Sequence, residues 1–271
     1  MARSFTLATW NINSVRIRTD LVERLAAERA PDVLCLQEIK CPEANFPASV
    51  FRKLGYVHQA INGQKGYHGV AVLSRLPFAA IDRRGFCDKG DARHIAVTVD
   101  DGGDGVEIHN LYVPAGGDEP DATLNEKFAH KLQFLNELEA WFGKDCVPRG
   151  HESILVGDLN IAPLEHDVWS HKDLLKVVSH TPVETEGLLR IQKKGKWADV
   201  MRQHVPADQK LYTWWSYRAK DWLAADRGRR LDHVWTTEGL AKACSAIAVL
   251  KDARGWTQPS DHVPVIASFT L

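Results

Sequence analysis

Short runs of apolar residues recur along the whole chain and predict β-strands. They are rich in Val, Ile, Leu and aromatic residues, and Gly, Pro or Asp commonly bounds them, as is typical of strands in a packed core. We expect strands at residues 5–10, 33–36, 69–73, 94–99, 106–113, 153–156, 231–236 and 263–269. Strands are therefore contributed by both ends and by the middle of the chain.

Between these runs, apolar residues recur at the spacing of an α-helix. Leu21 and Leu25 are four positions apart in a segment that stops before Pro31, whose ring disfavours a helical conformation in the preceding residue. A longer apolar stripe, at steps of four and three, comprises Phe128, Leu132, Leu135, Leu138 and Trp141. Such a stripe predicts a helix packed on the core. We expect two packed sheets flanked by helices, forming one domain over residues 1–271.

Composition narrows the class of protein. The chain has 271 residues, 44% of them hydrophobic, enough to bury an extensive core without disulfides. Its five cysteines are an odd number without a C-x-x-C pair, which predicts reduced thiols and no disulfide framework or zinc site. No apolar run approaches a membrane span, and no secretory signal is recognisable at the N-terminus. We expect a soluble, cytoplasmic protein.

The charge balance bears on the kind of partner. The formal net charge is −1, which argues mildly against a protein that coats nucleic acid by charge alone. An enzyme with a metal site remains compatible with this balance, because carboxylates gathered around a metal offset a basic face elsewhere.

Polar residues follow several predicted strands where no strand needs them. Each has a structural explanation when taken alone: Glu38 could be a surface carboxylate, and Asp and Asn are common in turns. Asp158 and Asn160 are two positions apart, so in an extended chain they face the same way. The full set at strand ends is Asn11, Glu38, Asn110, Tyr112, Asp158, Asn160, Asp232, Asp261 and His262. Loops at strand ends of a rigid scaffold are where many active sites are built.

Taken together, these residue types point to phosphate chemistry. Glu38, Asp158 and Asp261 offer the hard oxygen ligands that Mg²⁺ prefers. His262 beside an aspartate can accept a proton or stabilise a phosphoryl transition state, and the Tyr112 phenol can hydrogen-bond a phosphate oxygen. The combination indicates metal-assisted hydrolysis of a phosphodiester.

The motifs that carry these residues resemble the exonuclease III and abasic-endonuclease group of the endonuclease–exonuclease–phosphatase superfamily. The similarity covers nearly the whole chain. It includes TWNINSVR (9–16), PDVLCLQEIK (31–40), GQKGYHGVAVLSR (63–75), NLYVPAG (110–116), GDLNIAP (157–163), RRLDHVW (229–235) and PSDHVPV (259–265). The order LQE, GD-x-N and SDH marks the superfamily, and GQKGYHG is similar to its DNA-acting branch.

This resemblance implies a four-layered α/β sandwich with two packed central sheets flanked by helices and the site at one edge. It implies that Glu38 is the main ligand of Mg²⁺, with Mn²⁺ as a substitute. Asn11, Asp158, Asn160 and Asp261 would complete the metal site as a polar floor that holds metal-bound water and phosphate. His262 would be polarised by Asp232, Asp158 would accept the proton of the attacking water with Asn160 orienting that water, and Tyr112 would contact the scissile phosphate. Which of Asp158 and His262 is the base is left open.

The resemblance also implies a DNA substrate. The reaction would leave a 3′-hydroxyl and a 5′-phosphate on double-stranded DNA during base-excision DNA repair, through 3′-to-5′ exonuclease, 3′-end cleaning or abasic-site endonuclease activity. Lys65, Gly66 and Arg93 match positions that meet the DNA backbone, and Trp214 matches an aromatic loop that contacts DNA. We expect Trp215 and Tyr217 of the same loop to be core residues. No obligate protein partner is indicated, so we expect a monomer.

One position departs from the family pattern. Three residues before Asp232, where the family commonly has an apolar residue, this chain has Arg229. An apolar pocket there selects an abasic sugar, whereas an arginine would hold phosphate or stack. The departure weakens the case for abasic-site cleavage and affects 3′-end exonuclease action less.

Two other functions compete with this interpretation. A lipid or inositol-phosphate phosphatase would use the same scaffold, but the DNA-type motifs around residues 63–69 and Trp214 disfavour it. A non-catalytic DNA-binding relative should have lost some site residues. Every one of Glu38, Asp158, Asn160, Asp232, Asp261 and His262 is present. Fold alone would not separate these functions.

Overall fold

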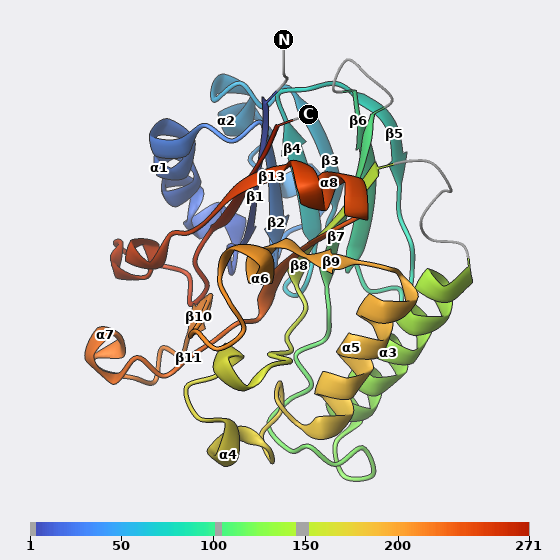
Figure 1. Cartoon of the computed structure of the whole chain (residues 1–271). Helices are drawn as coiled ribbons and strands as arrows, with labels where there is room; N and C mark the ends of the chain where they lie inside the picture. Colours follow the sequence, from blue (N-terminus) through green and yellow to red (C-terminus); the bar gives the residue numbers. More distant parts are fainter. Residues whose placement is uncertain (1–3, 101–104, 145–151, 271) are drawn as a thin grey trace.

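Two six-stranded sheets pack face to face in the computed structural model, which describes residues 4–100, 105–144 and 152–270 (Figure 1). The first sheet has the order β13 (Cys244–Val249), β14 (Val265–Thr270), β1 (Ser4–Asn11), β2 (Val33–Gln37), β4 (Val70–Ser74) and β3 (His58–Asn62). The second has the order β5 (Phe78–Asp82), β6 (His94–Val99), β7 (Val106–Tyr112), β8 (Glu152–Asp158), β12 (Asp232–Thr236) and β9 (Ala198–Asp199). A short ribbon, β10 (Trp214–Trp215) with β11 (Gly228–Arg229), lies beside them.

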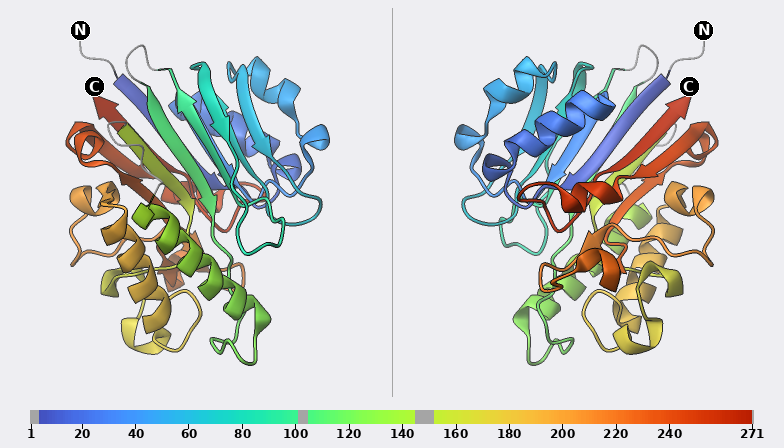
Figure 2. Two further views of the ribbon diagram at one scale, coloured as in Figure 1. Left: turned by 90° about the vertical axis from the view of Figure 1, so that its right-hand side faces the viewer. Right: turned by 90° about the vertical axis from the view of Figure 1, so that its left-hand side faces the viewer.

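Helices cover the outer face of each sheet and complete four layers (Figure 2). The main helices are α1 (Thr19–Arg29) and α2 (Ala48–Lys53) on the first sheet, and α3 (Glu126–Lys144) and α5 (Pro182–Lys194) on the second. Short helices are α4 (His171–Leu174), α6 (Val200–His204), α7 (Trp222–Ala225) and α8 (Glu238–Ala243). Single 3-10 turns are η1 (Val15–Ile17), η2 (Glu43–Asn45), η3 (Glu165–Asp167) and η4 (Lys251–Gly255). None of the described helices is long and apolar enough to cross a membrane.

The alternation of side chains between the two faces of each strand explains this layering. In β1, Phe5 and Leu7 enter the core between the sheets, whereas Ala8 and Trp10 pack with Leu21 of α1 and its neighbours, as the two-residue period of a strand requires. The outer core of the second sheet contains Phe134, Leu135 and Leu138 of α3 with Leu188 and Ile191 of α5. The predicted apolar stripe of α3 is therefore a packing face.

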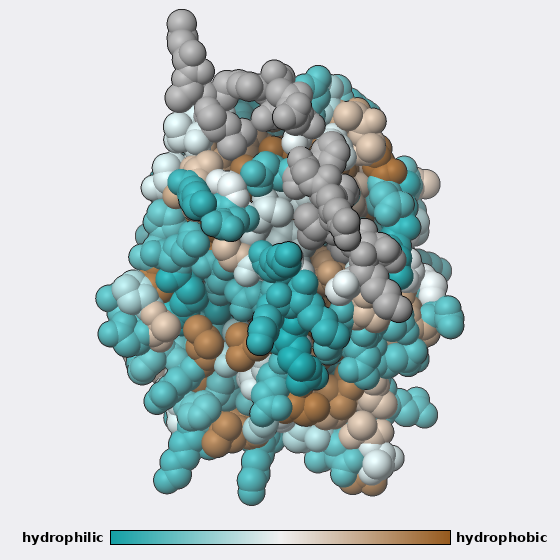
Figure 3. Space-filling model, turned by 45° about the vertical axis from the view of Figure 1, so that its right-hand side comes forward, coloured by the Kyte–Doolittle hydropathy of each residue, from teal (hydrophilic) through white to brown (hydrophobic). Residues whose placement is uncertain are grey.

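The parallel pairs set the position of the site. β1 pairs parallel with β2 in the first sheet, and β7 pairs parallel with β8 in the second. The carboxyl ends of all four strands lie at the same edge of the sandwich (Figure 1). Asp158 at the end of β8 is opposite Tyr112 on one side and Asp232 on the other. The face shown in Figure 3 is mostly hydrophilic, and its apolar side chains form small separate areas rather than one docking patch.

Candidate active site

Asn11 joins side chains that come from both sheets. Its amide nitrogen donates to Glu38 Oε1 (2.9 Å) and to Asp158 Oδ2 (2.8 Å), and lies 3.4 Å from His262 Nε2. Its amide oxygen accepts from the backbone N–H of Asn13 (3.0 Å). Residues separated by more than a hundred positions in the sequence thus share one hydrogen-bonded cluster at the strand ends.

Local backbone geometry aims these side chains. Glu38 directly follows β2 and Asn160 lies two residues beyond the end of β8, with φ of 50° and 54°, a left-handed conformation that costs a non-glycine residue about 1–2 kcal/mol. Gly157 has φ of 136°, and a Cβ there would collide with the carbonyl oxygen of Leu111. Glycine therefore permits the close approach of β7 and β8 immediately before Asp158.

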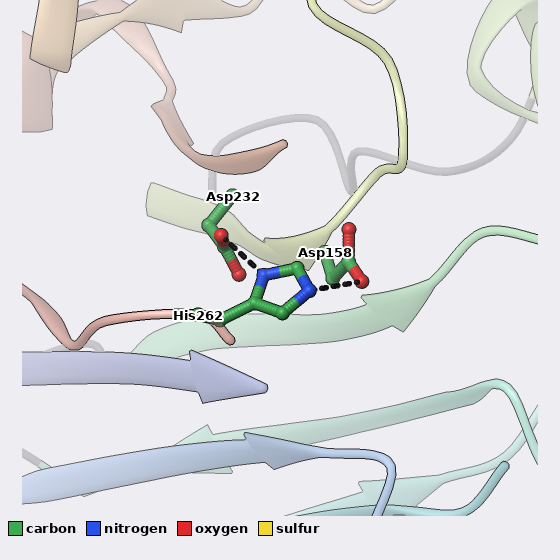
Figure 4. A group of neighbouring side chains, drawn as sticks. All are labelled: Asp158, Asp232 and His262. Carbon is green, nitrogen blue, oxygen red and sulfur yellow. Dashed lines mark hydrogen bonds and ion pairs between the residues drawn. The ribbon is translucent and has the colours of Figure 1, made fainter. Parts of the chain in front are cut away.

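A buried carboxylate–imidazole–carboxylate row forms the centre of the cluster (Figure 4). His262 Nδ1 lies 2.8 Å from Asp232 Oδ2, and His262 Nε2 lies 3.6 Å from Asp158 Oδ2. Burial alone would lower the pKa of His262, but the charges of Asp232 and Asp158 outweigh it and raise that pKa to about 10. Burial raises the pKa of Asp158. His262 is therefore an imidazolium at neutral pH, held by Asp232 in a fixed orientation.

Asn160 fixes the Asp158 carboxylate from the other side. The backbone N–H of Asn160 donates to Asp158 Oδ1 (2.9 Å), and its amide nitrogen donates to Asp158 Oδ2 (3.1 Å) and to the carbonyl of Val113 (2.9 Å). Asp158 thus accepts three N–H donors from Asn160 and Asn11. Its orientation is set before any substrate binds.

Glu38 occupies the more open side of the cluster. Its carboxylate accepts from the Tyr112 hydroxyl (2.8 Å) and pairs with Lys40 (2.7 Å). Burial tends to raise the pKa of Glu38, but the Lys40 ammonium and the Asn11 amide hold it below its ordinary value. Glu38 is therefore ionised. Lys40 also donates to Asn13 Oδ1 (2.6 Å), and neither Lys40 nor Asn13 was among the residues singled out from the sequence, although both lie inside the quoted motifs.

Asp261 lies at the rim of the cluster. Its Oδ1 accepts from Asn13 Nδ2 (3.2 Å) and its Oδ2 accepts from the Trp214 indole N–H (3.0 Å). Among the described residues, the group of His, Cys, Asp and Glu ligand atoms within 4.8 Å of one another consists of Asp158, Asp232 and His262. Glu38 and Asp261 thus flank this group from outside.

A cavity of about 720 Å³ opens from the cluster. Its lining combines Glu38, Tyr112, Asp118, Asn160, Asp261 and His262 with Trp169, Trp214, Trp222, Arg218, Arg227 and Arg229. The cavity therefore brings acidic and imidazole groups together with tryptophans and arginines.

The residues expected to contact DNA are placed differently from one another. Trp214 lines the cavity. Lys65 and Gly66 are exposed on the loop between β3 and β4. Arg93 is only 5% exposed, pairs with Asp91 (3.0 Å) and stacks 5.1 Å from the Tyr112 ring centroid, a position suited to orienting Tyr112.

The aromatic loop is only partly core. Trp215 is 2% exposed, as expected, but the prediction that Tyr217 is buried is wrong, because 48% of it is exposed. Its hydroxyl donates to the carbonyl of Pro259 (2.8 Å) and accepts from Arg18 (3.2 Å). The Tyr217 side chain is therefore held at the surface by hydrogen bonds and not by packing in the core.

Two packed mixed sheets with a carboxylate–imidazole row at the strand ends define a class of α/β enzymes. A family model described as "Endonuclease/Exonuclease/phosphatase family" matches residues 8–262, and the chain belongs to this family.

Relatives and solved structures agree with this assignment. The exodeoxyribonuclease III of Haemophilus influenzae is 32% identical, over 96% of this chain and 98% of that protein. An AP endonuclease from Archaeoglobus fulgidus has a TM-score of 0.88 and 30% identity, covering 98% of this chain and 99% of its own. A Neisseria 3′ phosphatase bound to a product DNA hairpin has a TM-score of 0.88 and 31% identity, covering 98% and 99%. These likenesses confirm the predicted fold class.

Proposed function

We propose that this protein is a divalent-metal-dependent DNA phosphodiesterase of base-excision repair that hydrolyses phosphodiesters at 3′ ends and at abasic sites. The buried Asp232–His262–Asp158 row at the end of a cavity that also contains Glu38 carries this proposal. It is supported by similarity to exodeoxyribonuclease III and to an AP endonuclease. The protein would act on double-stranded DNA without an obligate protein partner.

The donor set fits a hard divalent cation. Carboxylate and amide oxygens are the ligands that Mg²⁺ and Mn²⁺ prefer, and Glu38 is ionised and lines the cavity. Glu38 would hold the metal, with Asp158, Asn160 and Asp261 as the other oxygen donors. Asn11 directs its nitrogen toward the carboxylates, so we assign it the role of orienting them. A bound metal would neutralise charge on the phosphate and on the leaving oxygen.

The residues of the row would divide the proton chemistry. Asp158 would accept a proton from the attacking water, whose oxygen bonds to phosphorus as the bond from phosphorus to O3′ breaks. The His262 imidazolium would stabilise negative charge on the phosphoryl oxygens, and Asp232 would keep the ring charged and oriented. The Tyr112 hydroxyl, which donates to Glu38 in the absence of substrate, would turn its single O–H to a phosphate oxygen while Arg93 stays stacked on the ring.

A labelled duplex with a recessed 3′ end and a central abasic analogue tests the function. With Mg²⁺, we expect stepwise 3′ shortening or incision at the analogue, and with EDTA we expect neither. Asp158→Ala and His262→Ala should abolish cleavage while circular dichroism stays unchanged, and Lys242→Ala on the surface should cleave like the unmodified protein. Absence of DNA cleavage together with hydrolysis of a soluble phosphoester would redirect the assignment to a non-DNA substrate.

A further inference from the structure

His68, in the motif GQKGYHG, joins two loops that border the active site. Its carbonyl accepts the backbone N–H of Lys40 (3.0 Å) in the loop after β2. The backbone N–H of the adjacent Gly69 donates to the carbonyl of Ala92 (2.9 Å) in the loop before β6. His68 has φ of 56°, a left-handed conformation that a histidine adopts only where the surrounding structure maintains it. Its side chain therefore has a defined direction.

The imidazole of His68 is a hydrogen-bond acceptor for Arg93. Arg93 Nη2 lies 3.3 Å from His68 Nε2, and a guanidinium group can only donate. The proton of the neutral His68 ring is therefore on Nδ1. Burial and the positive charge of Arg93 lower the pKa of His68 to about 4, so the ring is a neutral acceptor at neutral pH.

Three groups hold the Arg93 guanidinium in one orientation. Its Nε donates to Asp91 Oδ2 (3.0 Å), its Nη1 to the carbonyl of Tyr112 (3.4 Å) and its Nη2 to His68. In this orientation the guanidinium carbon lies 5.1 Å from the centroid of the Tyr112 ring. The His68 ring lies against the same phenol, with ring centroids 6.0 Å apart. His68 thus contacts Tyr112 directly and also through Arg93.

The Tyr112 hydroxyl has to change partners without a movement of its ring. In the absence of substrate it donates to Glu38 (2.8 Å), and in the proposed reaction the same O–H turns to a phosphate oxygen. Rotation of the O–H alone is sufficient only if the ring keeps its place. A misplacement of about 1 Å can cost about 10²-fold in rate, so the groups that pack against the phenol affect the reaction.

We propose that His68 is a positioning residue that holds Arg93 against Tyr112 and so keeps the phenol directed at the scissile phosphate. His68 acts through these two neighbours and does not itself contact a reacting atom. This role rests on the proposed DNA phosphodiesterase function.

Substitutions at His68 test the role through kcat. His68→Phe keeps a ring against Tyr112 but removes the acceptor, and it should lower kcat on a recessed 3′ end by about 10- to 10²-fold with little change in KM. His68→Gln supplies an amide oxygen that accepts from Arg93, so kcat should largely recover. Both variants share the left-handed backbone, so its strain is common to them. His58→Phe, half-buried at the amino end of β3, should cleave like the unmodified protein.

A double-mutant cycle with Tyr112→Phe shows whether His68 acts through the phenol. Because Tyr112→Phe has no hydroxyl to position, adding His68→Phe should lower kcat no further. An equal fold-loss from His68→Phe in both backgrounds would overturn the proposal. So would a His68→Gln protein as slow as His68→Phe.

NMR spectroscopy of isotope-labelled protein gives an answer that does not depend on DNA cleavage. The guanidinium N–H signals of Arg93, assigned by their absence in Arg93→Lys, should exchange with water faster in His68→Phe than in His68→Gln or in the unmodified protein. Equal exchange rates in the three proteins would overturn the positioning role. Absence of cleavage of every DNA by the unmodified protein would instead refute the proposed function.

Discussion

A buried ion pair beneath the active site offers the sharpest test of how the fold supports it. Lys131 of α3 and Glu184 of α5 are both fully buried, with Nζ and Oε1 2.5 Å apart. Lys131 Nζ also donates to the carbonyls of Asn160 (2.8 Å) and Ala115 (3.2 Å). The pair thus joins two helices to the loop that follows Asp158. We predict that Lys131→Met destabilises the protein strongly.

The expected loss of stability follows from the Glu184 charge that the substitution leaves unpaired. Removing one partner of a buried ion pair costs about 3–5 kcal/mol, because the remaining charge is uncompensated. Glu184 would still accept the backbone N–H groups of Ser179 and Thr181, so we expect about 3 kcal/mol for Lys131→Met. In the double variant Lys131→Met/Glu184→Gln neither charge of this pair is left buried. Its cost should therefore be lower than the sum of the single variants by at least about 1 kcal/mol.

Urea unfolding followed by far-UV circular dichroism measures these free energies of unfolding. Lys194→Met is the matched control, because Lys194 pairs with Glu139 at 2.8 Å but is 53% exposed, and such pairs contribute about 1 kcal/mol or less. A Lys131→Met protein as stable as this control, or strictly additive single variants, would refute the reasoning.

Three further predictions concern the centre of the second sheet. Asp232→Asn should reduce kcat by about 10²–10⁴-fold without unfolding the protein, because the orientation and charge of His262 are lost; a cleavage assay with circular dichroism checks this, and near-normal kcat contradicts it. Burial and Arg230 lower the pKa of His233 to about 4, below its unfolded value of about 6.5, so stability is complete above pH 6.5 and is lost as pH falls toward 4. Between pH 7.5 and 5 the unmodified protein should lose about 2 kcal/mol more than His233→Gln, and equal losses in urea titrations would contradict this. Gly157→Ala should lower the yield of folded protein because its Cβ meets the Leu111 carbonyl, and a melting temperature like that of the unmodified protein would contradict it.

The strands that could be predicted from the sequence are the inner ones. All eight predicted runs correspond to β1, β2, β4, β6, β7, β8, β12 and β14, each of which has a neighbour on both sides. The missed strands of the two large sheets, β3, β5, β9 and β13, are the four sheet edges, and the two-residue strands β10 and β11 were missed as well. In β5 and β13 most residues are half-buried or exposed. Edge strands bury less surface and so carry a weaker apolar pattern.

The site residues also fall into a group that the sequence predicts and a group that it does not. Polar residues at the ends of inner strands could be predicted as a group, because the carboxyl ends of the parallel strands and the amino ends of the antiparallel strands β12 and β14 meet at one edge. Contacts between side chains from distant loops could not be predicted. The pairing of Lys40 with Glu38, the burial of Arg93 under Tyr112 and the exposure of Tyr217 depend on which rotamers and loop paths the packed structure allows. Local sequence patterns contain no information about them.

The Lys131–Glu184 pair links the catalytic cluster to Arg229 in the lining of the cavity. On one side Lys131 holds the carbonyl of Asn160, whose N–H groups orient Asp158. On the other side Glu184 accepts the N–H of Ser179, whose hydroxyl accepts from Arg229. One ion pair therefore supports both the carboxylate proposed to take the proton and an arginine of the cavity lining. Lys131→Met should accordingly lower kcat in a cleavage assay even under conditions where circular dichroism shows that the variant is folded, because the support of the Asn160 backbone is lost.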